Sequence, residues 1–132
     1  MKYLKLFENY ENKLNKEMLI NLFITALEGG SNHWYYIKDI PNEVRNIQRK
    51  KNLTLSEAIG EFILNNGKIY IYDIEDQNEV LGFINMDKLL DAINIMKQKY
   101  PNNYENIISE MDDAEDADIF LQLATMGNIV YG

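Results

Sequence analysis

The stretch KIYIYDIEDQNEVLGFI, residues 68–84, decides the fold class of this chain. From Lys68 to Ile74 isoleucine alternates with tyrosine, which is typical of a strand whose two faces meet different surroundings. A polar turn over residues 75–78 separates this run from a second apolar run, Val80–Ile84. Two apolar runs joined by a short polar turn predict an antiparallel hairpin.

Apolar residues at helical spacing flank this hairpin on both sides. We expect one helix from near Asn15 to Gly29 or Gly30, and another that begins with a capping box of Thr54 and Glu57. The other helices are expected through Val44 and Ile47, from Asn85 to Pro101, over residues 104–111, and from Asp112 or Asp113 to Gly127.

Two further segments favour strands. Residues His33–Ile40 are rich in aromatic side chains, with Trp34, Tyr36 and Lys38 on one face, and Ile129–Tyr131 is a short apolar run. Helices and strands are mixed without a regular βαβ alternation. The sequence therefore predicts a single α+β domain, residues 1–132, with four or five helices packed on a small, mostly antiparallel sheet of three or four strands.

The composition excludes several classes of protein. There is no cysteine, so disulfides, thiolate metal sites and a cysteine nucleophile are excluded. No run approaches the ~20 apolar residues that a membrane-spanning helix needs. The first residues, MKYLKLFENYENK, lack the apolar core of a secretory signal, so we expect a cytoplasmic protein without a membrane partner.

Charge is unevenly distributed along the chain, whose formal net charge is -8. Residues 1–66 hold 9 basic and 8 acidic residues, a net charge of +1, whereas residues 67–132 hold 4 and 13, a net charge of -9. A general nucleic-acid binder shows the opposite bias, so direct binding of nucleic acid is not expected. The asymmetry favours a basic partner for the second half, and it predicts a domain with two electrostatic ends.

Two segments carry a resemblance. The first is ALEGGSNHWY, residues 26–35, and the second is DADIFLQLA, residues 116–124, followed by GNIVYG at 127–132. Together they are similar to small phage and prophage proteins that share an ALEGGSN-x-WY helix exit and a C-terminal DAD-x-x-x-QLA…G-x-IVYG segment. This chain departs from that pattern at His33 and Met126, where aromatic residues are expected. The resemblance implies a phage accessory protein in the cytoplasm of an infected bacterium, and no specific reaction.

The turn after the first helix is one candidate binding site. Its backbone amides could form an anion-binding nest, and the aromatic residues that follow could stack on a nucleotide-like ligand. The candidate residues are Gly30, Ser31, Asn32, His33, Trp34 and Tyr35. The same residues suit any helix-to-strand turn, and the sequence favours a core position for Trp34. His33, the only histidine, favours a surface or hydrogen-bonded role over catalysis.

Two other features carry alternative interpretations. Both arginines, Arg45 and Arg49, lie in the only basic cluster, which could bind phosphate but also suits a solvated helix face. Tyr70 and Tyr72 share one face of a predicted strand. They form either an exposed binding platform or a wall of the core.

An acidic run precedes and opens the predicted last helix, and it is a candidate partner-binding surface. Its members are Glu110, Asp112, Asp113, Glu115, Asp116 and Asp118. The run could mimic nucleic-acid phosphates for a basic partner, whereas its spacing does not match a calcium-binding loop. Acids in a first helical turn also stabilise the helix itself, and this ordinary role is the favoured interpretation.

We expect no catalytic constellation, no metal site and no cofactor, because no nucleophile–base or ligand pattern is present. The first functional hypothesis is a non-enzymatic phage protein that inhibits a bacterial defence by docking its acidic surface on a nucleic-acid-handling effector, as some anti-CRISPR proteins do. The second is a protein, expected as a homo-oligomer, that sequesters a cyclic or ADP-ribose-type nucleotide messenger with Asn32, Trp34, Tyr35 and Arg45. A regulatory or structural phage protein is a third hypothesis.

Overall fold

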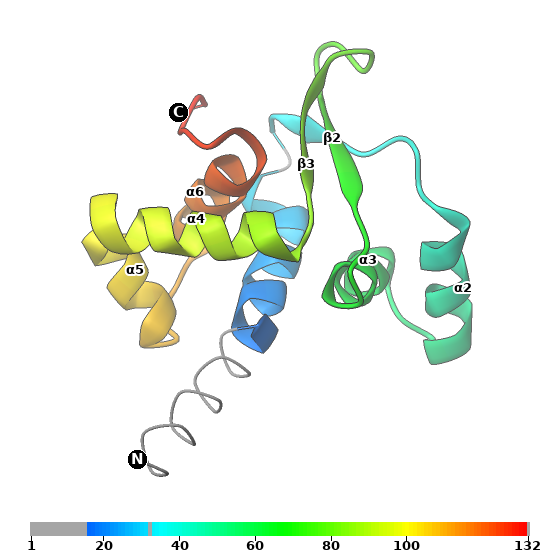
Figure 1. Cartoon of the computed structure of the whole chain (residues 1–132), viewed down its shortest axis with the longest axis horizontal. Helices are drawn as coiled ribbons and strands as arrows, with labels where there is room; N and C mark the ends of the chain where they lie inside the picture. The colour runs from blue at the N-terminus through cyan, green and yellow to red at the C-terminus, as the bar shows by residue number, and fades with distance from the viewer. Residues whose placement is uncertain (1–15, 32, 132) are drawn as a thin grey trace, which may run out of the picture.

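A computed structural model describes residues 16–31 and 33–131 of the protein, and the expected helix cap at Asn15 lies outside them. Residues 16–25 are α-helical and continue into a π-helical turn, η1 (Ala26–Gly30). The elements that follow are β1 (Tyr35–Tyr36), α2 (Asn42–Lys51), α3 (Leu55–Leu64), β2 (Ile69–Asp73), β3 (Val80–Ile84), α4 (Met86–Lys99), α5 (Pro101–Ile108) and α6 (Ala114–Met126). The predicted α+β class is confirmed (Figure 1).

The strands form one antiparallel sheet in the order β1-β2-β3. The predicted hairpin is confirmed: Tyr70 lies opposite Phe83, and a bulge between Ile71 and Tyr72 shifts the register before Val80. In Figure 1 the tip of this hairpin extends beyond the helices. One face of β2 is therefore set by Ile69 and Ile71, which are buried, and the other by the tyrosines.

Helices lie on both sides of the hairpin (Figure 1). The pair α2 and α3 lies on one side, α4, α5 and α6 lie on the other, and the helix of residues 16–30 runs between them. A single apolar cluster joins these groups; its largest fully buried side chains are Trp34, Phe23, Phe120, Leu19, Ile63, Ile69, Ile71, Ile84, Leu89, Met96, Ile107 and Leu121. No helix in the described part of the chain is long and apolar enough to cross a bilayer.

Within the described residues, the predicted N-terminal caps of three helices are confirmed. Thr54 and Glu57 form a reciprocal capping box at the start of α3, and Asn85 caps α4. Asp113, one of the two expected residues, caps α6. Each cap satisfies backbone N–H groups that have no partner within their own helix.

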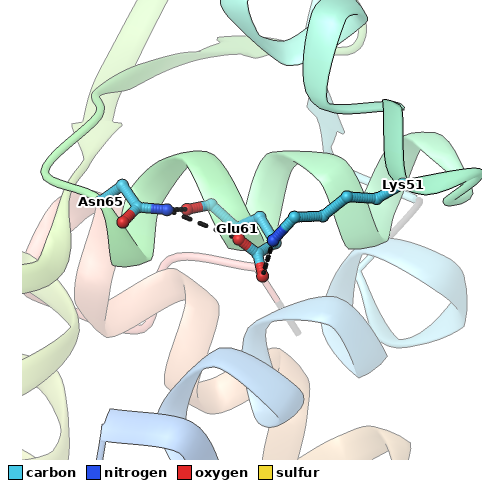
Figure 2. A network of polar contacts seen from close by, with 3 residues as sticks. All are labelled: Lys51, Glu61 and Asn65. Carbon is cyan, nitrogen blue, oxygen red and sulfur yellow. Dashed lines mark hydrogen bonds and ion pairs between the residues drawn. The ribbon is translucent and has the colours of Figure 1, made fainter. Parts of the chain in front are cut away.

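An ion pair links the end of α2 to α3 (Figure 2). Lys51 Nζ lies 3.1 Å from Glu61 Oε1, while Asn65 Nδ2 donates to the Glu61 backbone carbonyl across 2.9 Å. Both charged side chains are partly exposed, so the pair contributes at most about 1 kcal/mol. The position of α2 depends instead on its apolar side, where Val44 is fully buried.

Two strand predictions were wrong in extent, because other hydrogen bonds compete for the backbone. Of His33–Ile40, only Tyr35–Tyr36 pairs with β2; Trp34 lies in a turn in which its N–H donates to the Ser31 carbonyl. Residues 129–131 form no strand, because Val130 and Tyr131 donate their N–H groups to the Gln122 side chain.

The first helix ends at Gly30, but not through a left-handed glycine at position 29. It widens into η1, and Ser31 N–H donates to the Ala26 carbonyl across 3.0 Å. A π-helical turn of this kind is rare in proteins and is often found at functional sites.

Gly82 marks the closest approach of the sheet to α6. A Cβ atom at this position would lie 2.2 Å from the backbone carbonyl oxygen of Thr125. Backbone cannot move aside as a flexible side chain can, so only glycine allows β3 to pack this closely against the end of α6.

Replacement of Gly82 by alanine is expected to lower the free energy of unfolding by about 1–3 kcal/mol, the usual cost of overpacking. Gly29→Ala is the matched control, because no atom lies within 4 Å of a Cβ placed there. Urea denaturation of both variants measures the difference. Equal stability of the two variants would contradict the close approach of β3 to α6.

Candidate functional site

The carboxylate of Asp118, on α6, is the centre of a polar network. Its Oδ1 accepts hydrogen bonds from Ser31 Oγ at 2.6 Å and from Trp34 Nε1 at 2.7 Å. Its Oδ2 accepts one from Gln122 Nε2 at 3.0 Å. Hydrogen bonds to an ionised acceptor are stronger than neutral ones, so Asp118 fixes the exit of the first helix against α6.

Gln122 extends the same network to residues 130 and 131. Its Oε1 accepts from the N–H groups of Val130 and Tyr131 at 2.9 and 2.8 Å, and its Nε2 also donates to the Tyr131 carbonyl. The Tyr131 ring stacks on Trp34, with centroids 5.4 Å apart and planes 13° apart. The two segments that carry the resemblance therefore lie side by side and form one structural unit.

This unit leaves little for a ligand to contact. Trp34 is 1% exposed and Ser31 is fully buried, so both belong to the core, as the sequence favoured for Trp34. His33 is exposed, and Asn32 lies outside the described residues. Gly30 is the last residue of η1.

A pocket of about 440 Å³ lies beside β1 and between η1, α2 and α3. It is lined by Leu27, Tyr35, Tyr36, Ile37, Lys38, Ile40, Arg45, Leu55, Ser56 and Ile59. The walls are mainly apolar, and the polar groups are two cations, two tyrosines and one serine. This volume lies within the range of small-molecule sites.

Tyr35 and Arg45 are the two predicted ligand-binding residues that the structure brings together in this pocket. Tyr35 is half-buried and donates its hydroxyl to the Leu27 carbonyl across 2.6 Å, and burial raises the pKa of that hydroxyl. Arg45 is exposed, and one guanidinium nitrogen donates to Gln48. Arg49 is also exposed but donates to Asn46 and does not line the pocket.

Among the pocket residues with polar groups, sequence reasoning missed Tyr36, Lys38 and Ser56. The alternation within His33–Ile40 already placed Tyr36 and Lys38 on one face. No local pattern signalled Ser56, because its place in the pocket depends on how α3 packs against β1.

Three of the six residues of the acidic run form hydrogen bonds that stabilise the fold. Asp116 is 2% exposed and accepts from the side chains of Asn103 and Asn106 at 2.7 and 3.3 Å, as well as from Asp113 N–H. Asp113 is the cap of α6, and Asp118 is bonded to Ser31, Trp34 and Gln122. The expectation that Asp116 belongs to an exposed surface was therefore wrong.

Two of the remaining three acids line a second pocket. Glu110 and Asp112 line a space of about 370 Å³ together with Glu17 of the first helix, while Glu115 is exposed on α6. The apolar residues of this pocket are Met18, Leu22, Ile107 and Ile108. Its surroundings combine negative charge with an apolar floor.

Comparison with known proteins finds no matching family model, no similar curated protein and no similar solved structure. Across residues 16–31 and 33–131, no three carboxylate or histidine side chains are grouped so as to hold a metal ion. The pockets and the charges around them are therefore the basis for any functional proposal.

Replacement of Asp118 by asparagine is expected to lower the free energy of unfolding by about 2–3 kcal/mol, because Ser31 and Trp34 lose an ionised acceptor. The amide nitrogen of the new asparagine would also face the amide nitrogen of Gln122, so two hydrogen-bond donors would oppose each other. Urea denaturation followed by the fluorescence of Trp34, the only tryptophan, measures both the stability and the indole environment.

Glu115→Gln is the control for this substitution, because it removes one charge from the exposed side of the same helix. Its effect should stay below about 1 kcal/mol, the scale of a charge interacting with a helix end. A loss as large as that of Asp118→Asn would mean that total charge, rather than the Asp118 network, stabilises α6.

Proposed function

We propose that the protein is a non-enzymatic binding protein that captures a nucleotide-type ligand in the pocket beside β1. The observation that carries the proposal is the position of Arg45 and Lys38 in a pocket whose other walls are aromatic and aliphatic. Phosphate groups need cations and hydrogen-bond donors, whereas bases need flat apolar surfaces. Both requirements are met within one pocket of about 440 Å³.

Arg45 is the main candidate for phosphate recognition. The structure gives its guanidinium a single 3.3 Å hydrogen bond, to Gln48, and a guanidinium has five N–H donors. Lys38 adds a second positive charge, and Ser56 adds a hydroxyl. Tyr36 contributes its ring to the lining, and Leu55 and Ile59 contribute apolar side chains.

The lining also supports binding rather than turnover. None of the residues that line this pocket is a carboxylate or a histidine. These are the side chains that most often act as general bases in hydrolysis. In this pocket the cations would neutralise the charge of a bound ligand and the apolar side chains would pack against it. The ligand would then be released unchanged.

The resemblance to phage proteins gives this binding a biological setting. A phage protein that holds a nucleotide messenger lowers its free concentration and so prevents activation of a defence effector in the infected cell. Capture of this kind needs affinity and protein abundance but no chemistry, in accord with the proposed lack of catalysis.

Arg45→Ala is expected to weaken nucleotide binding at least tenfold, because the main phosphate donor is lost. Arg49→Ala, one turn further along α2 and outside the pocket, should bind as the unaltered protein does. Thermal shifts against AMP, cyclic dinucleotides and ADP-ribose measure this, since a ligand at 100 times its Kd adds about 2.7 kcal/mol of stability. Melting temperatures unchanged by every nucleotide would refute the proposal.

A second candidate function rests on the acid-rimmed pocket. Glu17, Glu110 and Asp112 lie around its apolar floor, and the neighbouring Met111 is 74% exposed. An exposed methionine beside carboxylates suits a partner that is both basic and apolar. We propose this surface as the docking site for a basic, nucleic-acid-handling defence effector.

The double variant Glu110→Gln/Asp112→Asn is expected to lose capture of such an effector from nuclease-treated host extract. Asp76→Asn/Glu79→Gln, in the exposed β2–β3 turn, changes the charge equally and should retain capture. Raised salt should weaken the retained complex, because exposed charges are screened. Identical capture by both variants would exclude this surface as the docking site.

A further inference from the structure

The outer face of the sheet is aromatic. Tyr36 lies opposite Tyr72, and Tyr70 lies opposite Phe83. Tyr70 is 45% exposed and the other three rings are half-buried, so Tyr70 and Tyr72 do not form a wall of the core. We call these four side chains the aromatic face.

Three lysines lie against the rings of the aromatic face. Lys38 Nζ lies 4.6 Å from the centre of the Tyr72 ring, and Lys88 Nζ lies 5.1 Å from that of Phe83. Lys68 Nζ lies within reach of both Tyr70 and Phe83, at 5.2 and 5.1 Å. Within the described residues none of the three forms a salt bridge, so their charges are available to an anionic ligand.

Of two acids near the aromatic face, Asp73 points away from it and Asp39 lies beside it. Asp73 alternates with Tyr72 along β2 and so points to the opposite face, where its charge helps to raise the pKa of Tyr131 after the larger effect of burial. Asp39 accepts a hydrogen bond from the Tyr72 hydroxyl at 3.1 Å. That bond lies at the edge of the Tyr72 ring, and Lys38 Nζ lies over the ring itself, so a base on Tyr72 would share the ring with this ammonium group.

The aromatic face is continuous with the pocket beside β1. Tyr36 belongs to both, and Lys38 lines the pocket while its ammonium group lies over Tyr72. A ligand that extends from the pocket past Lys38 therefore reaches Tyr72 and then Tyr70. Alternating aromatic rings and cations match the alternating bases and phosphates of a single strand.

We propose that the ligand is a short oligonucleotide, with one nucleotide in the pocket and the next one or two bases stacked on Tyr72 and Tyr70. This inference rests on the proposed function. It narrows the ligand to a nucleotide messenger with several bases and excludes ADP-ribose, which has one base. The net charge of -8 favours a short ligand, because each phosphate beyond the reach of the lysines adds repulsion without a paired cation. An acidic protein can recognise a short strand through a local group of cations, whereas its overall charge disfavours general binding of nucleic acid.

Isothermal titration with 5′-phosphorylated oligoadenylates of one, two, three and about ten nucleotides tests the length dependence. Stacking on an aromatic side chain should raise affinity about fivefold or more for each added base, up to two or three nucleotides. The ten-nucleotide strand should bind no more tightly than the trinucleotide. A steady rise in affinity up to ten nucleotides would overturn the limit on length.

Variants separate the aromatic face from the pocket. Tyr70→Ala should remove the gain from added bases and leave binding of AMP unchanged, whereas Tyr70→Phe should keep the gain because its ring still stacks. Lys68→Gln should lower the salt dependence of trinucleotide binding and leave that of AMP unchanged.

The outcomes distinguish the two proposals. If AMP binds in an Arg45-dependent way but added bases bring no gain, the oligonucleotide inference fails and the pocket function stands. If no nucleotide of any length binds, both fail. If the trinucleotide binds through Tyr70 and Arg45→Ala has no effect, the pocket is not part of the site, and the continuous site is refuted.

Discussion

The hydrogen bonds to Asp118 are the interaction on which the rest of the structure depends. One carboxylate accepts from the exit of the first helix, from the only tryptophan and from Gln122, which in turn holds residues 130 and 131. Without this acceptor, Ser31 and Trp34 would be buried donors with no partner, a costly arrangement in a protein interior. The network also sets the direction in which the chain enters β1, and β1 lines the proposed ligand pocket.

Much of the fold was predictable because its signals are local. The capping box of Thr54 and Glu57 and the alternation around Tyr70 each act within a few residues. The predictions that were wrong depend on contacts with residues outside the segment concerned. Residues 129–131 were expected to form a strand from their apolar composition, but their backbone bonds to Gln122, a partner that strand propensity does not reveal.

The candidate site was predictable only in part, for the same reason. Tyr35 and Arg45 were chosen for their chemistry, and folding brings both to one pocket. Asp116 was assigned to the surface because acids are usually solvated, although it lies four residues before Phe120, on the buried side of α6. Helical spacing could have identified it as an internal residue.

The two halves of the sequence, which differ in charge, contribute together to two local sites. Lys68 and Lys88 come from the acidic second half, yet they lie with Lys38 against the aromatic face. Glu17 comes from the nearly neutral first half, yet it lines the same pocket as Glu110 and Asp112. The molecule carries a cationic aromatic surface on its sheet and an acidic pocket among its helices, and each of them combines residues from both halves.

The Asp118 network also has a consequence for synthesis on the ribosome. Ser31 and Trp34 precede their acceptor by 87 and 84 residues. At a translation rate of about 5–20 residues per second, Trp34 is made about 4–17 s before Asp118. During that interval an indole destined for the core has no acceptor and no Tyr131 ring to cover it. The burial of Trp34 therefore belongs to the last stage of folding, after residues 118–131 have been made.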